Sequence, residues 1–242
     1  MPFEFLTNAP LAEARDNYIA ALLSRGFAAG EETVPVPDSA GRVTARAVYA
    51  AICAPHYPAS AMDGIALPAR RTFGATEITP VTVAAGDYVT VDTGDPIPDG
   101  CDAVVMVEEL VPAENGAVKL YAPAAPWQNI RQIGEDICAG EMILASHTAI
   151  SPAAIGAMLA AGVLTVPVLR RPRVGIIPTG DEVVPPTENP GPGDVVEFNS
   201  SIFSAMLREW GADPVTYPIV PDKREAIRAA VETALSECDI VL

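Results

Sequence analysis

The stretch that decides the fold of this chain is Val174-Gly175-Ile176-Ile177-Pro178-Thr179-Gly180-Asp181-Glu182. Its apolar first part, stopped by a proline and a glycine, is typical of a buried strand. In open α/β sheets, ligands bind beyond the carboxyl ends of the strands. We therefore expect Thr179, Asp181 and Glu182 to lie where a ligand would bind. The long loop that continues to Asn199 indicates either a binding function or disorder.

The residues after this loop predict a helix and then a strand. Ser200 or Ser201 can cap the helix, because a serine oxygen accepts a hydrogen bond from the first turn. Gly211 is expected to end the helix, and residues 215–220 have the composition of a strand. The apolar residues that recur at helical spacing, and that we expect to face inward, are Ile202, Phe203, Met206, Leu207 and Trp210.

A second helix and a third strand complete the pattern. Asp222 and Glu225 have the spacing of a capping box, and Asp239 begins another apolar strand. Alternating strands and helices predict a doubly wound parallel α/β sheet. Because the chain stops on a strand at Leu242, we expect this domain to be incomplete and truncated. In the second helix the expected inward residues are Ile227, Ala230, Val231, Ala234 and Leu235.

The N-terminal region, residues 1–171, has a mixed α+β pattern. Short β-rich segments separated by turns predict a β-rich subdomain, roughly residues 55–140, inserted into a helical part. Asn115-Gly116 is a strong hairpin signal within it. The pattern changes near Arg170-Arg171-Pro172, so residues 172–242 are expected to form the α/β domain.

Two helices are expected outside the β-rich subdomain. Pro10 is placed in the first turn of one that Gly26 ends, and Ser151 caps another that has Pro152 at its first turn. In the first helix the residues expected to face inward are Leu11, Ala14, Tyr18, Ala21 and Leu22.

Composition narrows the possible partners and compartments. The formal charge of −16 over 242 residues argues against nucleic acid or an anionic membrane as a partner. An anionic substrate would need a cation to mediate its contact with this chain. The N-terminus lacks a signal-peptide pattern, and residues 152–169 resolve into a helix and a strand rather than a membrane span. We therefore expect a cytoplasmic, globular protein.

The cysteines and histidines show no metal-ligand spacing. No Cys-x-x-Cys pair occurs, so buried and unpaired thiols are favoured over disulfides or zinc. The residues concerned are Cys53, Cys101, Cys138, Cys238, His56 and His147.

Three motifs in the N-terminal region gather carboxylates and hydroxyls in glycine-containing turns. They are Ser60-Ala61-Met62-Asp63-Gly64, Asp92-Thr93-Gly94-Asp95-Pro96-Ile97-Pro98, and Arg131 with Gly134-Glu135-Asp136-Ile137. Taken singly, each is explained by ordinary turn chemistry.

Their order and spacing resemble the molybdopterin molybdenumtransferases, a family that includes the bacterial MoeA enzymes and the E domain of gephyrin. The resemblance covers residues 11 to 242 and includes the segment from Ala103 to Glu108 and Thr179-Gly180-Asp181-Glu182. It implies an elongated N-terminal region followed by the first part of a molybdopterin-binding domain, so that enzyme activity is expected of the full-length protein and not of this chain alone. Pro126-Trp127 and Glu197-Phe198-Asn199 are similar to a branch that carries a further periplasmic-binding-protein-like domain.

The resemblance implies a reaction and a set of site residues. Such enzymes transfer molybdate to the sulfurs of adenylylated molybdopterin, with magnesium assisting, and act as homodimers that share the site between chains. It implies catalytic roles for Asp63, Thr93, Asp136 and Glu182, cofactor contacts from Thr179, Gly180, Asp181 and Asn199, and Mg²⁺ ligands at Glu182 and Asp222.

Two other functions are weighed against this enzyme. One is a non-catalytic molybdopterin-binding or scaffolding protein of the gephyrin type. The other, a Rossmann-type nucleotide-binding protein, is disfavoured because no Gly-x-Gly-x-x-Gly follows any expected strand.

Overall fold

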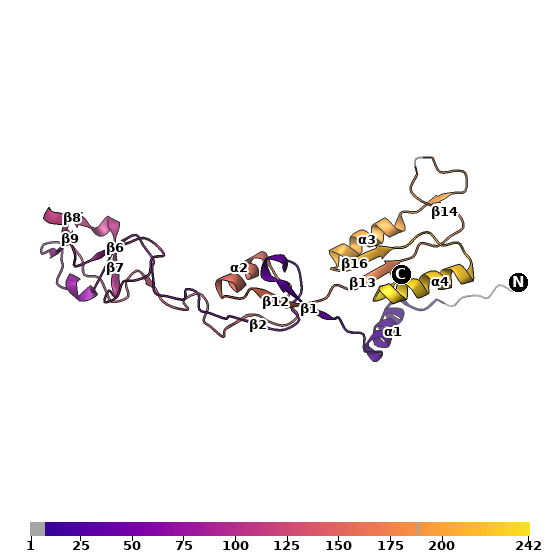
Figure 1. The fold of residues 1–242 in the computed structure, drawn as a ribbon, viewed down its shortest axis with the longest axis horizontal. Helices are drawn as coiled ribbons and strands as arrows, with labels where there is room; N and C mark the ends of the chain where they lie inside the picture. The colour runs from indigo at the N-terminus through magenta and orange to yellow at the C-terminus, as the bar shows by residue number, and fades with distance from the viewer. Residues whose placement is uncertain (1–7, 188) are drawn as a thin grey trace. The chain divides into compact units, whose positions relative to one another are not determined.

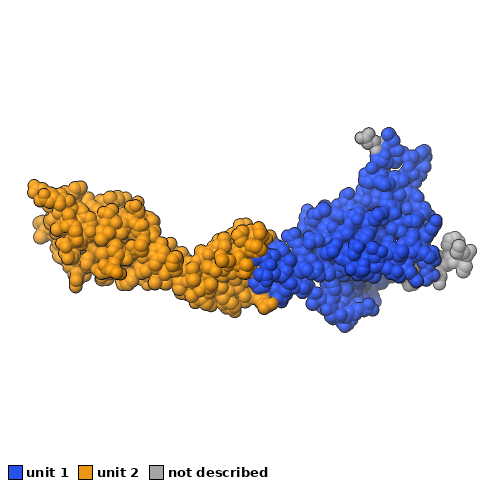
Figure 2. Space-filling view, in the orientation of Figure 1, with its two compact units in different colours: residues 1–34, 41–45, 167–242 blue, residues 35–40, 46–166 orange. Residues whose placement is uncertain are grey.

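The structure is a computed structural model that describes residues 8–187 and 189–242 (Figure 1). Contacts divide the chain into two compact units (Figure 2). The first unit comprises residues 1–34, 41–45 and 167–242, and the second comprises residues 35–40 and 46–166.

This division differs from the expected boundary near Arg170. In the first unit, the N–H of Leu169 donates to the carbonyl of Val43 at 2.8 Å, and the N–H of Arg170 donates to the carbonyl of Gly30 at 2.7 Å. These hydrogen bonds join segments that are far apart in the sequence. Residues 167–171 and the N-terminal helix therefore group with the α/β part of the chain.

The α/β part contains a parallel three-stranded sheet, as predicted, and its strand order is β16-β13-β17. Its strands are β13 (Arg173–Ile176), β16 (Asp213–Thr216) and β17 (Ile240–Val241). The helices α3 (Asn199–Glu209) and α4 (Arg224–Glu237) connect them. The buried core between sheet and helix consists of Val174, Ile176, Leu207 and Ala212.

Helix α3 corrects the predicted cap and the predicted buried face. Neither Ser200 nor Ser201 caps it; the Glu197 carboxylate accepts the N–H of Ser200 at 2.8 Å instead. The buried residues are Ser200, Ser204 and Leu207, which lie on one side of the helix. Ile202, Phe203 and Trp210 are exposed and Met206 is half-buried, so Leu207 alone of the five residues expected to face inward is buried against the sheet.

Helix α4 corrects the predicted capping box. Lys223 is its N-cap residue and no side chain caps the helix, while the N–H of Asp222 donates to Asp181. Ala234 is the buried residue of α4, and Leu235 is exposed. The remaining expected inward residues, Ile227, Ala230 and Val231, are half-buried.

The strand expected over residues 215–220 is shorter than predicted. β16 ends at Thr216, and Pro218, which has no N–H to donate, interrupts the segment. Val220 then returns to the sheet edge, where its N–H donates to the carbonyl of Pro178 at 2.9 Å.

Helix α1 (Leu11–Ser24) forms as predicted, but its apolar face is not buried. Pro10 is the N-cap residue rather than part of the first turn, and Gly26 follows the helix with φ +73°. None of its residues is buried, and Leu11 and Tyr18 are 86% and 56% exposed. Ala14 and Ala21 are also exposed and Leu22 is half-buried, so the predicted inward orientation is wrong.

The second unit contains two antiparallel three-stranded sheets, in the orders β6-β4-β7 and β5-β9-β8. A core of buried residues that includes Ile65, Leu67, Val105 and Leu120 joins them. The strands are β4 (Gly64–Leu67), β5 (Val81–Val83), β6 (Val89–Val91), β7 (Ala103–Met106), β8 (Val111–Pro112) and β9 (Val118–Leu120).

The predicted hairpin is confirmed at Asn115-Gly116. Both residues have positive φ, 56° and 73°, and the N–H of Ala117 donates to the carbonyl of Glu114 at 3.1 Å. Asparagine and glycine tolerate this backbone better than other residues, which explains the turn.

Helix α2 (Pro152–Ala160) begins where it was predicted to begin, because Ser151 Oγ accepts the N–H of Ala154 at 3.2 Å.

No helix in the described part of the chain is long and apolar enough to cross a membrane. The remaining elements are β1 (Glu31–Pro35), β2 (Val48–Tyr49), β3 (Ala59–Ser60), β10 (Ile130–Arg131), β11 (Met142–Leu144), β12 (Thr165–Leu169), β14 (Val183–Val184), β15 (Val195–Val196), and the short helices η1 (Val36–Asp38), η2 (Ala69–Thr72), η3 (Val107–Glu109) and η4 (Glu114–Gly116).

Candidate functional site

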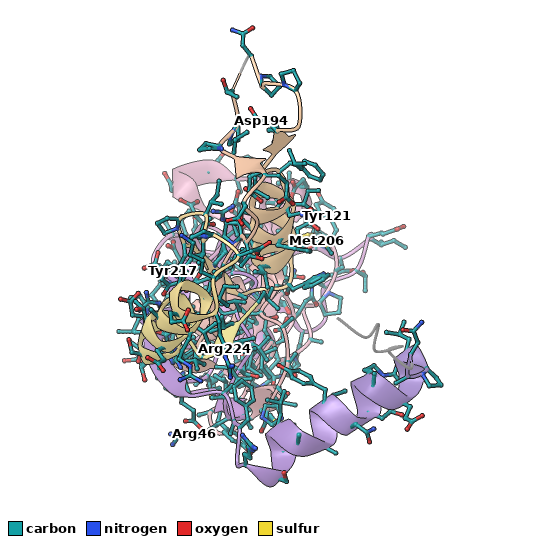
Figure 3. All side chains as sticks on the ribbon, turned by 90° about the vertical axis from the view of Figure 1, so that its right-hand side faces the viewer. Arg46, Tyr121, Asp194, Met206, Tyr217 and Arg224 are labelled. Atoms are coloured by element: carbon teal, nitrogen blue, oxygen red, sulfur yellow. The ribbon has the colours of Figure 1, made fainter. Side chains whose placement is uncertain are left out.

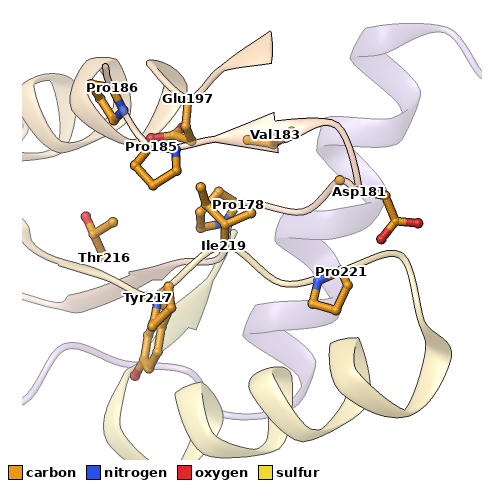
Figure 4. A pocket seen from close by; sticks show the side chains of 12 residues that line it. Pro178, Asp181, Val183, Pro185, Pro186, Glu197, Thr216, Tyr217, Ile219 and Pro221 are labelled. Atoms are coloured by element: carbon orange, nitrogen blue, oxygen red, sulfur yellow. The ribbon is translucent and has the colours of Figure 1, made fainter. Parts of the chain in front are cut away.

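The loops that follow β13 and β16 border a pocket of about 590 Å³ (Figure 4). A volume of this size suits a small-molecule ligand. Proline rings form much of its wall, and Asp181, Glu197 and Tyr217 supply the main polar groups. Rigid prolines hold such a wall in place with little conformational freedom to lose on binding.

The two loops are joined by backbone hydrogen bonds at the carboxyl end of the sheet. The N–H of Gly180 donates to the carbonyl of Val220 at 3.1 Å, and the N–H of Asp222 donates to the Asp181 carboxylate at 3.1 Å. Asp181 and Asp222 are thus neighbours, as expected from parallel strand ends. Asp181 and Gly180 line the pocket, whereas Glu182 and Asp222 do not.

Glycine is required at position 180. Its φ is +143°, and a Cβ there would lie 2.5 Å from Val183 Cγ2 and 3.2 Å from Glu182 Oε1. The turn after β13 therefore depends on the absence of a side chain at this position.

A second pocket, of about 290 Å³, lies on the other side of the same loop. Thr179 and Asn199 line it, so the structure brings together two of the predicted cofactor-binding residues. Ser200 lines it as well, and its hydroxyl is buried without a hydrogen-bond partner among the described residues. Buried hydroxyls normally have partners, so this oxygen is an unsatisfied polar group of a residue in the pocket wall.

The sequence did not identify Glu197 or Ser200 as site residues. Glu197 lines both pockets, and its carboxylate accepts a hydrogen bond from the N–H of Ser200. A serine next to a strand-to-helix loop was interpreted as a cap, and nothing in the local pattern distinguishes a cap from a buried ligand contact.

The long loop after Glu182 is organised by its own hydrogen bonds. The N–H of Val195 donates to the carbonyl of Glu182 at 2.9 Å, which pairs β15 with β14. Farther out, the N–H of Gly191 donates to the Asp194 carboxylate at 2.7 Å. Figure 3 labels Asp194 in this loop.

The two residues expected to hold magnesium have carboxylate side chains, and their oxygens are ligands of the kind that this ion prefers. Mg²⁺ is usually held by one or two carboxylates together with substrate phosphates. Glu182 and Asp222 meet that requirement in number and kind. In residues 8–187 and 189–242, no group of three or more His, Cys, Asp or Glu is placed to hold a metal.

In the second unit, the structure brings Asp63 and Thr93 together. Asp63 Oδ1 accepts hydrogen bonds from the Thr93 hydroxyl at 2.7 Å and the Thr93 N–H at 2.6 Å. These two bonds lower the pKa of the Asp63 carboxyl below its usual value, and the bond from the hydroxyl has the larger effect. Asp63 is thereby fixed as an exposed carboxylate at neutral pH.

Asp136 is paired with Arg131 in the same unit. Their side chains form an ion pair at 2.5 Å, and Glu135 accepts from the same guanidinium at 3.4 Å. The hydrogen bond to Asp136, followed by the one to Glu135, raises the pKa of Arg131. The motif around Gly134 is therefore an ordered turn that presents a charged pair to solvent.

Comparison with known protein families accounts for most of the chain. Residues 9–162 match the family described as "MoeA N-terminal region (domain I and II)". Residues 175–242 match the family described as "Probable molybdopterin binding domain". Since the first match covers more than half of the chain, the chain belongs to the MoeA family, as its motifs predicted.

Individual relatives agree with this family. The chain is 34% identical over 229 residues to molybdopterin molybdenumtransferase 2 of Mycobacterium tuberculosis, covering 87% of the chain and 56% of the relative. It is 30% identical over 230 residues to the molybdopterin molybdenumtransferase of Bacillus subtilis, covering 87% of the chain and 54% of the relative. The chain thus spans about half the length of the curated relatives it matches.

A solved structure shows the same fold. The crystal structure of a molybdopterin biosynthesis MoeA protein from Pyrococcus horikoshii matches with a TM-score of 0.78 and 33% sequence identity. This match covers 88% of the chain and 60% of that protein.

Proposed function

We propose that this chain acts in molybdenum cofactor biosynthesis as a molybdopterin molybdenumtransferase, and that its first unit binds the pterin substrate. The observation that supports this most directly is the pocket lined by Thr179, Asn199 and Ser200, because the buried Ser200 hydroxyl has no hydrogen-bond partner within residues 8–187 and 189–242. The family match of residues 175–242 gives the ligand class.

These side chains suit a phosphate or pterin group. The Ser200 hydroxyl and the Asn199 amide can donate hydrogen bonds, and both lie in the first turn of α3, the end of a helix that favours an anion. The Glu197 carboxylate opposes an anion at the same place. A bound anion therefore requires a cation or a displacement of Glu197.

A divalent cation would neutralise part of the negative charge on such a ligand. We assign it to Glu182 and Asp222, in the two loops that meet at the carboxyl end of the sheet. When bound, magnesium would polarise the phosphoanhydride of adenylylated molybdopterin and neutralise charge on its oxygens. The protein's own contribution is to hold the turn in place through Gly180 and the Asp181 carboxylate.

The second unit would supply Asp63, Thr93 and Asp136 as catalytic residues. Asp63 is an exposed, ionised carboxylate held by Thr93, and Asp136 is oriented by Arg131. We propose that these groups act on molybdate and pterin bound to a partner subunit in a homodimer. A cytoplasmic location and a further periplasmic-binding-protein-like domain remain predictions from the sequence.

The test uses two adjacent serines. The purified chain is titrated calorimetrically with molybdopterin, with and without magnesium, and Ser200→Ala is compared with Ser201→Ala. Ser201 is exposed, so its change leaves the pocket untouched. Ser200→Ala should weaken molybdopterin binding about 3- to 10-fold because one hydrogen bond is lost. Ser201→Ala should leave binding unchanged.

A second measurement separates the enzyme from a scaffolding protein. The full-length gene that contains this chain is introduced into a bacterial strain that lacks its own molybdenumtransferase, and the activity of a molybdenum enzyme is measured. Binding of molybdopterin without restoration of activity would favour the non-catalytic alternative. Absence of both would contradict the proposed function.

A further inference from the structure

Cys53 and Cys138, far apart in the sequence, lie on two segments of the second unit that pair antiparallel. The N–H of Ala54 donates to the carbonyl of Ile137 at 2.8 Å, and the N–H of Ile137 donates back at 3.2 Å. Cys53 and Cys138 are the next residues on the two segments in the register of this isolated bridge. In a regular antiparallel ladder, residues in that position form a non-hydrogen-bonded pair with Cα atoms about 4.5 Å apart, a separation that a disulfide can span.

The two sulfur atoms border one small space beside Gly134. A Cβ added to Gly134 would lie 2.9 Å from Cys138 Sγ and 3.6 Å from Cys53 Sγ. The sulfurs are therefore separated by no more than the sum of these distances. The Cys138 thiol donates to the carbonyl of Gly134 at 3.4 Å, and Cys53 Sγ accepts the N–H of Ala139 at 3.3 Å. A glycine with φ +75° leaves room that any other residue would fill.

Both thiols can be reached from solvent, and no other pair of cysteines shares this arrangement in the described chain. Cys138 is exposed and Cys53 is half-buried. Cys101 is half-buried, and its burial, followed by the charge of Asp102, raises the pKa of its thiol. Cys238 lies beside Tyr217, 3.6 Å from its hydroxyl oxygen.

We propose that Cys53 and Cys138 form a reversible disulfide when the chain meets an oxidised low-molecular-weight disulfide such as oxidised glutathione. The Cys138 thiolate attacks one sulfur of the small disulfide, a mixed disulfide forms, and the first glutathione thiolate leaves. The Cys53 thiolate then attacks Cys138 Sγ and displaces the second. The two cysteines are oxidised, the small disulfide is reduced by two electrons, and the two cysteine protons end on the two released thiols.

This bond has a mechanical consequence for the second unit. Residues 54–137, which include both three-stranded sheets, would become a covalently closed loop. Closing so long a loop restricts the unfolded chain and raises the melting temperature of this unit. The bond also constrains the turn from Gly134 to Asp136. The inference does not depend on the proposed function.

The experiment equilibrates the purified chain in glutathione buffers of increasing oxidised fraction. Free thiols are trapped with an alkylating reagent, and peptide mass spectrometry identifies which cysteines were protected. We expect one disulfide between the Cys53 and Cys138 peptides, reversed by dithiothreitol, with Cys101 and Cys238 still alkylated. The oxidised chain should show a higher melting temperature.

Two variants make the test decisive. The Cys101→Ser, Cys238→Ser double variant should oxidise like the original chain, because the proposed pair is intact. Cys53→Ser should stop at a glutathione adduct on Cys138, because the resolving thiol is missing. The proposal is overturned if Cys53 and Cys138 stay independently alkylatable across the buffers, or if another pairing dominates.

Discussion

Glu182 is a residue whose chemical role can be separated from any role in folding. Its side chain is exposed, and its backbone carbonyl, which accepts the N–H of Val195 at 2.9 Å, is unchanged by substitution. We predict that, in the full-length enzyme, Glu182→Gln abolishes the magnesium-dependent molybdenum insertion that we propose, because the proposed hard cation loses an anionic ligand. The melting temperature should stay close to that of the original chain.

Activity and thermal unfolding are measured on the same purified Glu182→Gln protein. Glu232→Gln, at an exposed position of α4, is the matched control with the same change in charge. Normal activity of Glu182→Gln would show that this residue only shapes the turn. A large drop in melting temperature would assign it a structural role.

The charge of Asp239 makes the stability of the α/β sheet depend on pH. Its carboxylate accepts two hydrogen bonds from Arg170, at 2.7 and 3.1 Å, and one from the N–H of Arg173 at 2.7 Å. The Arg170 side chain first, and the Arg173 N–H second, lower the pKa of Asp239. A lowered pKa stabilises the fold above the unfolded value of about 4, and this contribution is lost as the pH falls through the folded value.

We therefore predict that Asp239→Asn lowers stability at neutral pH by an amount on the order of 1 kcal/mol. The difference from the original chain should shrink below about pH 4. Urea unfolding midpoints at several pH values measure both effects. Asp213→Asn makes the same charge change at an exposed neighbouring site and is the control. An Asp239→Asn penalty that does not change with pH would rule out the ion pair as its cause.

At the residue scale, the sequence predicted which motifs come together better than it predicted burial. Asp63 and Thr93 were expected at one site and lie within hydrogen-bond distance. Ser200 was expected to cap a helix, yet its hydroxyl is buried and lines a pocket. Burial depends on which distant segment covers a residue, and the local spacing of residues does not predict that segment.

At the scale of elements, two glycines of α2 and its exit turn should respond to substitution in opposite directions. Gly156 lies within the helix with no atom within 4 Å of an added Cβ. Gly156→Ala should stabilise the fold by about 0.5–1 kcal/mol, because alanine restricts the unfolded chain and favours the helix. Gly162 has φ +75°, and a Cβ there would lie 3.0 Å from Ile52 Cγ1.

Gly162→Ala should therefore destabilise the fold, by about 1 kcal/mol or more. Denaturant unfolding of the two variants beside the original chain measures both signs in one experiment. If both substitutions shift stability in the same direction, the backbone conformation assigned to this helix and its exit turn is wrong.

Signals carried by short segments predicted elements well. The strand at Val174 to Ile176, the Ser151 cap and the Asn115-Gly116 hairpin all form, because each depends on backbone chemistry within a few residues. Helix faces were predicted poorly. Trp210 has helical spacing with Leu207 but is 70% exposed, since periodicity identifies a face without showing that another element covers it.

At the scale of the whole chain, the division into two units depends on contacts between distant segments, which the sequence pattern does not predict. The change of pattern near residue 171 was visible, but the hydrogen bond from Leu169 to Val43 was not. The formal charge of −16 was visible as well, and it bears on assembly. Two copies of so acidic a chain repel each other, so any dimer needs apolar contacts and should be favoured by salt.

Helix α1 offers such contacts in the N-terminal region. It buries none of its residues, and Tyr18 and Ile19 are 56% and 46% exposed. We predict that the protein dimerises through this region and that the Tyr18→Glu, Ile19→Glu double variant shifts it toward monomer, because two charges would have to be buried at the contact. Since both side chains are exposed, the variant should fold normally.

Sedimentation velocity at micromolar protein concentration, at low and high salt, decides this prediction. The original chain should form a dimer that tightens as salt screens its negative charge. Trp210→Glu makes the same type of change at an exposed position of the α/β part and should leave the dimer intact. A monomer under all conditions would remove the model in which Asp63 and Thr93 serve a partner's site. A dimer that survives the double variant would place the contact elsewhere than α1.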